Sequence, residues 1–424
     1  VVIGNPPYNG YAGVAIGEER ELSDAYRKAG AGPQPQGQGL NELYVRFFRM
    51  AERQIVEHSG RGIVSFISNS SWLDGLSHPA MRERFLQVFD HIWVDDLHGN
   101  RIISEYAPDG RTSETVFAVR GSSTGIKVGT AIVLLVRARQ GDASSAALRY
   151  ADFHEAQAAE RRNALLSSLD SAAAPRYVDV VPTVDLGRPF KPARVSSSYL
   201  AWPTLPELFQ ASYPGIKTSR DAVLVDIDRA ALEARMRRYF DPALSDATIA
   251  EEMPELMRAA SRFDPVATRR QLLALGFDSG RILRYAYRPF DVRWLYWHAE
   301  TKLLDEKRPD YVPQVFIGNP CLFTTGRTRK GKPEPAFVTQ IATDLNFQDS
   351  GARGIPLFLR ADHDDLLGAS SSPQPNLSKA AMRYLDGVAA APEDLFFHAL
   401  AILHSDAYRD ANAGALRQDW PRIP

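Results

Sequence analysis

Over residues 1–140, short apolar runs alternate with longer stretches that have helical spacing. The apolar runs, each expected to form a strand, are VVIG (1–4), GIVSFIS (62–68), HIWVDDL (91–97), ETVFAV (114–119) and GTAIVLLVR (129–137). Helical spacing occurs in LNELYVRFFRMAERQIVEHSG (40–60), with Gly60 as the predicted stop, and in PAMRERFLQVF (79–89). Apolar strands that alternate with helices predict a doubly wound, Rossmann-like α/β sheet buried on both faces.

The pattern changes after residue 140. Residues 141–185 are rich in Ala, Ser and Arg and predict a surface helix with a linker. Residues 186–424 are mixed, with a helical middle, the aromatic-rich stretch YAYRPFDVRWLYWH, the basic loop TTGRTRKGKPEP and a helical tail. A chain of 424 residues exceeds what one core usually supports. We therefore predict an α/β domain at 1–140, a helical linker at 141–185 and a mixed α+β domain at 186–424.

Composition narrows the class of protein only in part. The net charge of −1 neither indicates nor excludes nucleic-acid binding, because a charged groove can lie on a neutral protein. The longest apolar run, VGTAIVLLVRA, is shorter than the roughly 18 residues of a membrane span. The single cysteine, Cys321, fits a reducing cytoplasm, and the nine histidines include no pair with metal-site spacing. We expect a cytoplasmic protein with no membrane partner and no metal in this region.

The residues NPPY (5–8) follow the first predicted strand, at the end where doubly wound sheets bind ligands. A conjugated amino nitrogen is a weak nucleophile, and two hydrogen-bond acceptors can aim its lone pair at a methyl donor. The side-chain carbonyl of Asn5 and the backbone carbonyl of Pro6 can supply these acceptors. Pro6 and Pro7 fix the backbone and carry no N–H, while the ring of Tyr8 can stack on a planar substrate. The alternative is a proline-containing turn without a chemical role.

Several stretches resemble known methyltransferases. NPPY resembles motif IV of the amino-group methyltransferases that use S-adenosylmethionine. The stretches LNELYVRFFRMAERQI and GRGIVSFISNSSWLDG are similar to the helix and strand that come next in adenine-specific DNA methyltransferases. Four blocks in this order resemble the type ISP restriction–modification enzymes: NPPYNGYAGVAIGEERELSDAYR, DLHGN…APDG…ETVFAV…GTAIVLLVR, RPFDVRWLYW and LHSDAYRDANAGALRQDWPRIP. Those enzymes join a nuclease, a helicase-like motor, an adenine methyltransferase and a target recognition domain in one polypeptide.

The resemblance implies a site-specific adenine (N6) DNA methyltransferase with gamma-type motif order, acting on a base flipped out of the duplex. Asn5 and Pro6 would bind the adenine amino group and one edge of S-adenosylmethionine. Tyr8 would stack on the base, and Phe117 in ETVFAV would contact it from the other side. A strand position in the core is an equally good interpretation of Phe117.

The resemblance also implies what this chain contains. The family's glycine-rich cofactor loop precedes NPPY, and AGAG (29–32) neither follows a strand nor opens a helix. We expect the C-terminal half of a methyltransferase domain and a target recognition domain of a prokaryotic cytoplasmic enzyme. Its partners would be double-stranded DNA and the upstream nuclease, helicase-like and cofactor-binding regions of the same polypeptide. Alone, it would bind the cofactor weakly and be inactive.

Basic residues of the C-terminal part are candidates for DNA contacts, because Arg and Lys reach base edges and phosphates. The candidates are Lys217, Arg220, Arg327, Arg329 and Lys330. A solvated surface loop is the alternative for the last three. Arg288 and Arg293 lie among aromatic residues, and we expect them to be structural partners of a core.

Two other functions remain open from the sequence. NPPY also serves in the methylation of glutamine in proteins and of bases in RNA, although the long C-terminal part favours DNA. The chain could instead be a DNA-binding specificity module that is inactive without an upstream cofactor-binding half.

Overall fold

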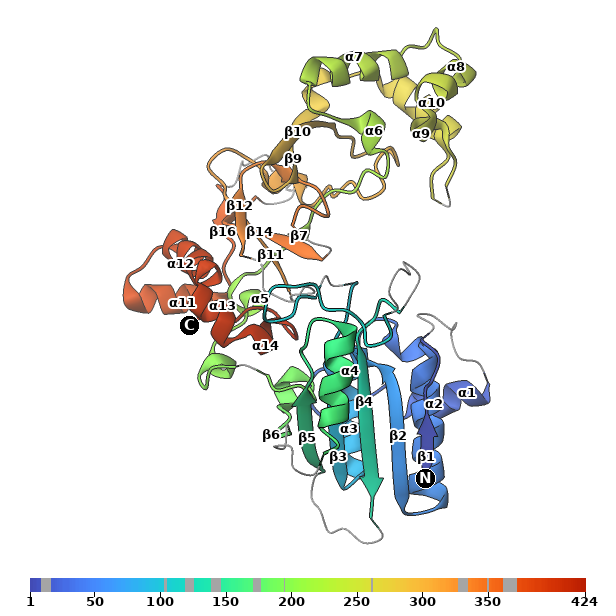
Figure 1. The fold of residues 1–424 in the computed structure, drawn as a ribbon. Helices are drawn as coiled ribbons and strands as arrows, with labels where there is room; N and C mark the ends of the chain where they lie inside the picture. Colours follow the sequence, from blue (N-terminus) through green and yellow to red (C-terminus); the bar gives the residue numbers. More distant parts are fainter. Residues whose placement is uncertain are drawn as a thin grey trace. The chain divides into compact units, whose positions relative to one another are not determined.

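The computed structural model describes residues 1–8, 17–102, 105–118, 126–138, 146–170, 177–193, 195–260, 262–326, 335–348, 351–360 and 372–424. These residues divide into two compact units, coloured along the sequence in Figure 1. The first unit contains the described residues of Val1–Leu200 and Asp410–Asp419. The second unit contains those of Ala201–Gly326, Glu334–Arg409 and Trp420–Pro424.

A mixed sheet forms the centre of the first unit. Its strands are β1 (Val2–Gly4), β2 (Gly62–Asn69), β3 (His91–Asp96), β4 (Thr130–Arg137), β5 (Ala147–Asp152) and β6 (Val178–Val180). Their spatial order is β1-β2-β4-β3-β5-β6. β1, β2, β3 and β5 share one direction, whereas β4 and β6 are antiparallel to their neighbours. The α/β class and the strands predicted near residues 1–4, 62–68, 91–97 and 129–137 are confirmed.

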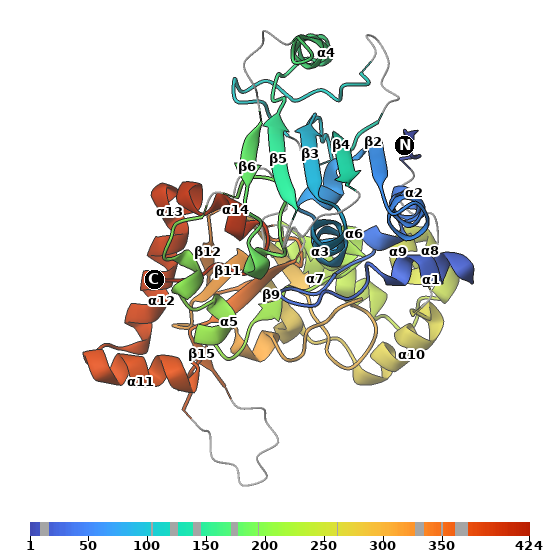
Figure 2. The same cartoon turned by 90° about the horizontal axis from the view of Figure 1, so that it is seen from below.

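Helices lie on both faces of this sheet. The α-helices of the first unit are α1 (Glu18–Asp24), α2 (Leu43–Glu52) with its π-helical continuation η2 (Arg53–His58), α3 (Pro79–Val88), α4 (Ala158–Ser167) and α14 (Ala413–Leu416). α2 and α3 cover one face and α4 the other, as Figure 2 shows. The larger core packs Phe48 of α2 and Phe85 of α3 against Phe66 of β2. The predicted helix at 40–60 is thus present, and Gly60, with φ 67°, follows its end.

The stretch predicted as a helical linker, 141–185, differs from the prediction. Its described residues contain β5, α4 and β6, which belong to the sheet and its cover. In β5 the buried side chains Leu148 and Tyr150 alternate with exposed Ala147 and Arg149, as in a strand that packs on one face. The Ala- and Arg-rich composition concealed this alternation. The first unit therefore continues to Leu200 rather than ending at residue 140.

The strand predicted at ETVFAV (114–119) is also absent over the residues that the structure describes there, 114–118. The backbone N–H of Ala118 donates to the carbonyl of Thr115, which closes a turn. Phe117 on this turn is 37% exposed. The interpretation of Phe117 as an inward residue of a core strand is therefore wrong, because a turn directs its side chain outward.

The second unit is α+β, as predicted for the C-terminal part. Its helices are α5 (Leu205–Leu208), α6 (Asp221–Leu224), α7 (Arg229–Tyr239), α8 (Asp246–Glu252), α9 (Pro254–Met257), α10 (Pro265–Leu275), α11 (Lys379–Val388) and α12 (Pro392–His404), and α13 (Asp406–Ala411) begins in it. One sheet has the order β13-β9-β10-β8, a second β12-β11-β14-β7, and β15 pairs with β16. These strands are β7 (Tyr213–Pro214), β8 (Val225–Asp226), β9 (Ile282–Arg288), β10 (Asp291–Tyr296), β11 (Cys321–Thr325), β12 (Phe337–Thr339), β13 (Ala342–Thr343), β14 (Ala352–Pro356), β15 (Phe358–Leu359) and β16 (Gln374–Pro375).

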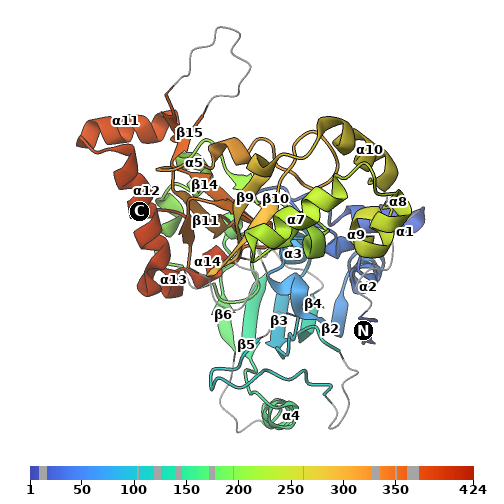
Figure 3. The ribbon, with the colours of Figure 1, turned by 90° about the horizontal axis from the view of Figure 1, so that it is seen from above.

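The aromatic-rich stretch of the sequence forms the hairpin β9–β10 in the core of the second unit. Tyr285 and Tyr296 are fully buried and pack with Leu295 and Phe323 in one hydrophobic cluster. Within this unit, α7–α10 lie at one end and α11 and α12 at the other, with the sheets between them (Figure 3). In the described part of the chain, no helix has the length and apolarity that crossing a membrane requires.

Two adjacent phenylalanines of α2 test the packing of the first unit. Phe48 is 1% exposed and touches four aromatic rings, whereas Phe47 is 38% exposed. We expect Phe48→Ala to lower the free energy of unfolding by about 3–5 kcal/mol, because it leaves a cavity. The matched variant Phe47→Ala should cost less than about 1 kcal/mol. Urea unfolding followed by tryptophan fluorescence measures both, and equal effects would contradict the packing described.

Candidate functional site

The candidate site of the first unit lies where its parallel strands end. β1, β2, β3 and β5 point the same way, so their carboxyl ends meet at one edge of the sheet. Polar residues follow each of these ends: Asn5 after β1, Asn69 at the end of β2, His98 after β3 and Asp152 at the end of β5. This is the edge at which open α/β sheets bind ligands.

The NPPY residues leave β1 at this edge. Asn5 and Pro7 are exposed, whereas Pro6 is buried and Tyr8 is partly buried. Burial raises the pKa of the Tyr8 hydroxyl to about 12. Among the described residues, that hydroxyl has no hydrogen-bond partner. Because Asn5 is exposed, its side-chain amide is available to a ligand. The two prolines that follow limit how the backbone that carries it can move.

Tyr8 and Phe117 lie together, although they are far apart in the sequence. Their ring centroids are 6.2 Å apart and the ring planes are inclined by 55°. A planar group sandwiched between two rings needs about 7–8 Å between them, which is two van der Waals contact distances. In the arrangement observed, the two rings contact each other at an angle and leave less than this separation.

Two arginines of α4 fix the turn that carries Phe117. The guanidinium of Arg161 is fully buried and donates to Ser113 Oγ at 2.9 Å and to the backbone carbonyls of Phe153, Glu114 and Glu155. Arg162 Nη1 donates to the carbonyl of Val116 at 2.8 Å. Because a buried guanidinium must have its donors satisfied, Arg161 constrains the backbone on both sides of this segment.

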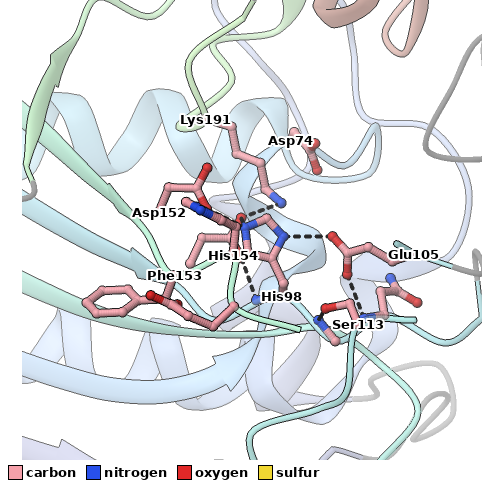
Figure 4. Close-up of polar contacts among 12 residues, drawn as sticks. Asp74, His98, Glu105, Ser113, Asp152, Phe153, His154 and Lys191 are labelled. Atoms are coloured by element: carbon pink, nitrogen blue, oxygen red, sulfur yellow. Dashed lines mark hydrogen bonds and ion pairs between the residues drawn. The ribbon is translucent and has the colours of Figure 1, made fainter. Parts of the chain in front are cut away.

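A network of charged groups centred on the buried Asp96 lies beyond β3 and β5 (Figure 4). One ring nitrogen of His98 is 2.7 Å from Glu105 and the other is 2.7 Å from Asp152. Asp96, which is fully buried, accepts from Tyr150 at 2.9 Å and pairs with Lys191 at 2.6 Å. Ser113 connects this network to the segment that leads to Phe117. Its Oγ accepts a hydrogen bond from the N–H of Gly99, just after β3, and its N–H donates to the carbonyl of Glu105.

The same contacts set the charges in this network. Burial alone would favour neutral His98, but the carboxylates of Asp96, Asp152 and Glu105 raise its pKa to about 10. Burial likewise opposes the charge of Asp96, yet His98 and Lys191 hold its pKa well below the usual range. His98 is therefore a cation at neutral pH and acts as a structural ion-pair partner rather than as a base. No group of His, Cys, Asp and Glu side chains within the described ranges is arranged to bind a metal ion.

A second titratable group lies near the end of β2. Burial raises the pKa of Glu42 to about 7, although a hydrogen bond from Asn69 at 3.1 Å acts in the opposite direction. Asn69 also accepts from Ser71, so it orients the turn after β2. Sequence reasoning missed Glu42 and His98. The one local signal was their position next to predicted element ends, and their partners come from distant segments.

The structure separates the DNA-binding candidates of the second unit. Lys217 is exposed and forms an ion pair with Asp305 at 2.8 Å. Arg220 is only 6% exposed, lies over the ring of Phe263 and donates to the carbonyl of Leu303 at 2.9 Å. Burial lowers its pKa. The DNA contact predicted for Arg220 is therefore contradicted, because its guanidinium is used inside the unit.

The remaining candidates, Arg327, Arg329 and Lys330, lie outside the described residues.

The second unit has another basic surface, which the sequence did not predict. Lys379 and Arg383, one turn apart on α11, line an open cavity of about 650 Å³ together with Gln210 and Gln374. Their spacing on a helix gave no motif to detect.

Comparisons with known proteins identify the family and the fold of the chain. The family model described as the Type ISP C-terminal specificity domain matches residues 207–424, which is half of the chain. The chain therefore belongs to the Type ISP family, and the resemblance stated from the sequence is confirmed. No curated protein matches the chain.

Solved structures match the fold over the whole chain. A cryo-EM structure of a DrdV–DNA complex has a TM-score of 0.69 at 22% identity. The structure of a nuclease-deletion mutant of the Type ISP restriction–modification enzyme LlaGI with a DNA substrate mimic has a TM-score of 0.66 at 21% identity. The structure of the ATP-dependent Type ISP enzyme LlaBIII bound to DNA has a TM-score of 0.68 at 19% identity. Each match covers 100% of this chain but 42%, 39% and 28% of those chains, respectively.

The His98 network predicts a specific pH dependence of stability. The pKa of His98 is raised from 6.5 to about 10 on folding, so its stabilising contribution is complete below pH 6.5 and is lost as the pH rises towards 10. We expect His98→Gln to lower the free energy of unfolding by more than about 1 kcal/mol at pH 6, and by much less at pH 10. Urea unfolding at both values measures the difference.

The control for this prediction is His154→Gln. His154 lies 3.6 Å from Asp152 but has a side chain that is 54% exposed. It should change stability little at either pH. Backbone strain at His98, with φ 48°, is the same at both pH values and cancels in the comparison. A cost of His98→Gln that is constant from pH 6 to pH 10 would contradict the charged state assigned to His98.

Proposed function

We propose that this chain supplies the amine-orienting loop and the DNA-specificity unit of an adenine-specific (N6) DNA methyltransferase within a Type ISP restriction–modification enzyme. The observation that carries the proposal is the arrangement after β1. An exposed Asn5 follows the carboxyl end of a parallel strand. Three residues further along the chain, the ring of Tyr8 lies beside the ring of Phe117. An amide acceptor and two flat rings suit a planar substrate that carries an amino group.

The proposed chemistry depends on positioning. The side-chain carbonyl of Asn5 and the backbone carbonyl of Pro6 would accept the two amino hydrogens of adenine. This draws the nitrogen away from conjugation with the ring and directs its lone pair away from the base plane. Pro6 and Pro7 hold these acceptors in place and present no competing N–H. Such orientation and directed electrostatics can account for catalysis without a base of shifted pKa.

S-adenosylmethionine, when bound, would supply the methyl group. Asn5 and Pro6 can form only one edge of its site. The glycines of AGAG do not fit a cofactor loop, because the N–H of Gly30 donates to Glu83 at 2.6 Å. A Cβ at Gly32 would lie 2.5 Å from the carbonyl oxygen of Val184, so that side of the loop is covered. We propose that the main cofactor-binding loop lies in another part of the longer polypeptide.

Binding of a flipped adenine would require the aromatic pair to open. The rings of Tyr8 and Phe117 are too close, at 6.2 Å, to sandwich a base. Tyr8 belongs to the proline-restrained NPPY segment, whereas Phe117 lies on a turn outside the sheet. We propose that the side chain of Phe117 rotates away, while Tyr8 and the turn held by Arg161 and Arg162 remain in place. The closed pair would then fill the base site when no base is present.

Double-stranded DNA is the proposed substrate and partner. The specificity-domain match over residues 207–424 and the DNA present in the three solved complexes favour DNA over RNA or a protein glutamine. Lys217, Arg327, Arg329 and Lys330 remain candidate phosphate contacts, and we add Lys379 and Arg383 beside the open cavity. The alternative, a specificity module that has no activity of its own, predicts DNA binding without methyl transfer.

Asn5→Ala is the direct test of the amine-orienting role. In the full-length protein, we expect methyl transfer from labelled S-adenosylmethionine to duplex DNA to fall by about a thousandfold or more, since the loss of directed acceptors acts on the reacting nitrogen. The affinity for DNA should change by less than about threefold, because most of that affinity comes from phosphate contacts. Unimpaired methyl transfer by the variant would refute the role given to Asn5.

A matched pair of variants tests stacking by Tyr8. Its hydroxyl lacks a partner among the described residues, so Tyr8→Phe should retain methyl transfer within about threefold. Tyr8→Ala removes the ring and should lower kcat/KM by about tenfold to a hundredfold, in line with roughly 1–3 kcal/mol for stacking on one base. Steady-state kinetics measure both variants. If Tyr8→Phe were as impaired as Tyr8→Ala, the hydroxyl rather than the ring would be the functional group.

A further inference from the structure

The tip of the β9–β10 hairpin carries an exposed aromatic residue. Arg288 pairs with Asp291, so Pro289 and Phe290 form a two-residue turn between the strands. Phe290 is 97% exposed, in contrast to Tyr285 and Tyr296 of the same hairpin, which are fully buried. Within the described ranges, its one ring contact is with Phe337, which it meets edge-on with centroids 6.1 Å apart. The hairpin thus presents a large apolar side chain to solvent.

The backbone at Phe290 is unfavourable for this residue. Its φ is +66°, and a bulky side chain at positive φ is a conformational outlier. A turn with proline first and positive φ second has the φ pattern of a type II turn, which favours Gly or Asn in that position. The turn Phe316–Asn319 of the same unit has this favoured arrangement, with Gly318 at φ 85°. Folding alone therefore does not account for phenylalanine at the hairpin tip.

The same hairpin carries two partly exposed arginines, Arg288 and Arg293. The guanidinium groups of Arg288 and Arg293 lie over the ring of Tyr287, at 4.2 and 4.0 Å from its centroid. Arg288 pairs with Asp344 and Arg293 with Asp291, each at 2.7 Å. The side chains of the two arginines are 40% and 32% exposed. Since a guanidinium has five N–H donors, each can contact a phosphate while its ion pair persists.

We propose that Phe290 is an apolar wedge that enters the base stack of duplex DNA, with Arg288 and Arg293 contacting the adjacent phosphates. The inference rests on the proposed DNA-binding function and adds a site to it. An opened base step offers a flat base face and phosphates, and the hairpin carries a protruding apolar side chain at its tip and two partly exposed arginines on its strands. A purely apolar protein partner would leave the exposed N–H donors of the two arginines without acceptors.

The test uses DNA in which stacking is already weakened. Binding of the full-length protein is measured by fluorescence anisotropy, without divalent metal, to a labelled duplex with a central mismatch and to its fully paired counterpart. Because a wedge must pay for unstacking in the paired duplex, the wild type should prefer the mismatched duplex by about tenfold. Phe290→Ala should reduce this preference to less than about twofold. Its affinity for the paired duplex should change by less than about threefold.

Three further variants separate a wedge from other roles. Phe290→Leu should retain the preference, since aliphatic side chains also act as wedges. Ile317→Ala removes an apolar side chain that is 98% exposed on the comparison turn and should leave the preference unchanged. Phe290→Gly should lose the preference without a lower melting temperature, because glycine accepts positive φ. A lower melting temperature would instead indicate a structural role against Phe337.

Each remaining outcome has a defined meaning. An unchanged preference in Phe290→Ala, or an equal loss in Ile317→Ala, overturns the wedge. Loss of self-association or of a protein partner in Phe290→Ala, with DNA binding intact, overturns it as well and assigns the tip to a protein interface. Failure of the wild type to bind either duplex contradicts the proposed function itself, and is thereby distinguished from failure of the wedge alone.

Discussion

The pairing of β4 between β2 and β3 is the constraint on which the first unit depends. β4 is antiparallel to both neighbours along nearly its whole length, and Ala131, Val133 and Leu135 on it are buried. A strand buried in this way must have all its backbone groups paired, so the register on either side is strongly specified. That register aligns the carboxyl ends of β2 and β3. With β1 and β5 parallel to them, the polar residues after four strands come to one edge.

Charge burial then organises the loops that leave this edge. Arg161 and Asp96 are fully buried, and each has charged or polar partners that come from other segments. Burying such groups is costly unless they are paired, and removing one partner leaves the other unsatisfied. The segment that reaches Phe117 is therefore held by several hydrogen bonds of the buried Arg161, and losing one partner would leave the others less stable. A site built in this way can have a fixed element, the NPPY segment, beside a turn that is attached through side chains.

The second unit treats its arginines in two ways. Arg220 is enclosed between Phe263 and backbone carbonyls, where its charge stabilises the unit and is not available to a ligand. Arg288 and Arg293 keep part of their surface exposed while they stack on Tyr287. The planar guanidinium permits both, because it can stack on a ring and donate within its plane at the same time. A basic residue in this sequence is thus no guide to a DNA contact until its surroundings are known.

The sequence by itself determined the features that depend on neighbouring residues. Prolines restrict their own backbone and the residue before them, so the extended segment that carries Asn5 after a short strand was predictable. The helix that ends just before Gly60 and the strand β2 were predictable from the spacing of their apolar residues. The order of the motifs also indicated the Type ISP family. Only the tertiary structure decided that Tyr8 meets Phe117, that β5 belongs to the sheet and that Arg220 is buried. These outcomes depend on partners distant along the chain, and no local pattern of apolar and polar residues specifies which distant segment will fold against it.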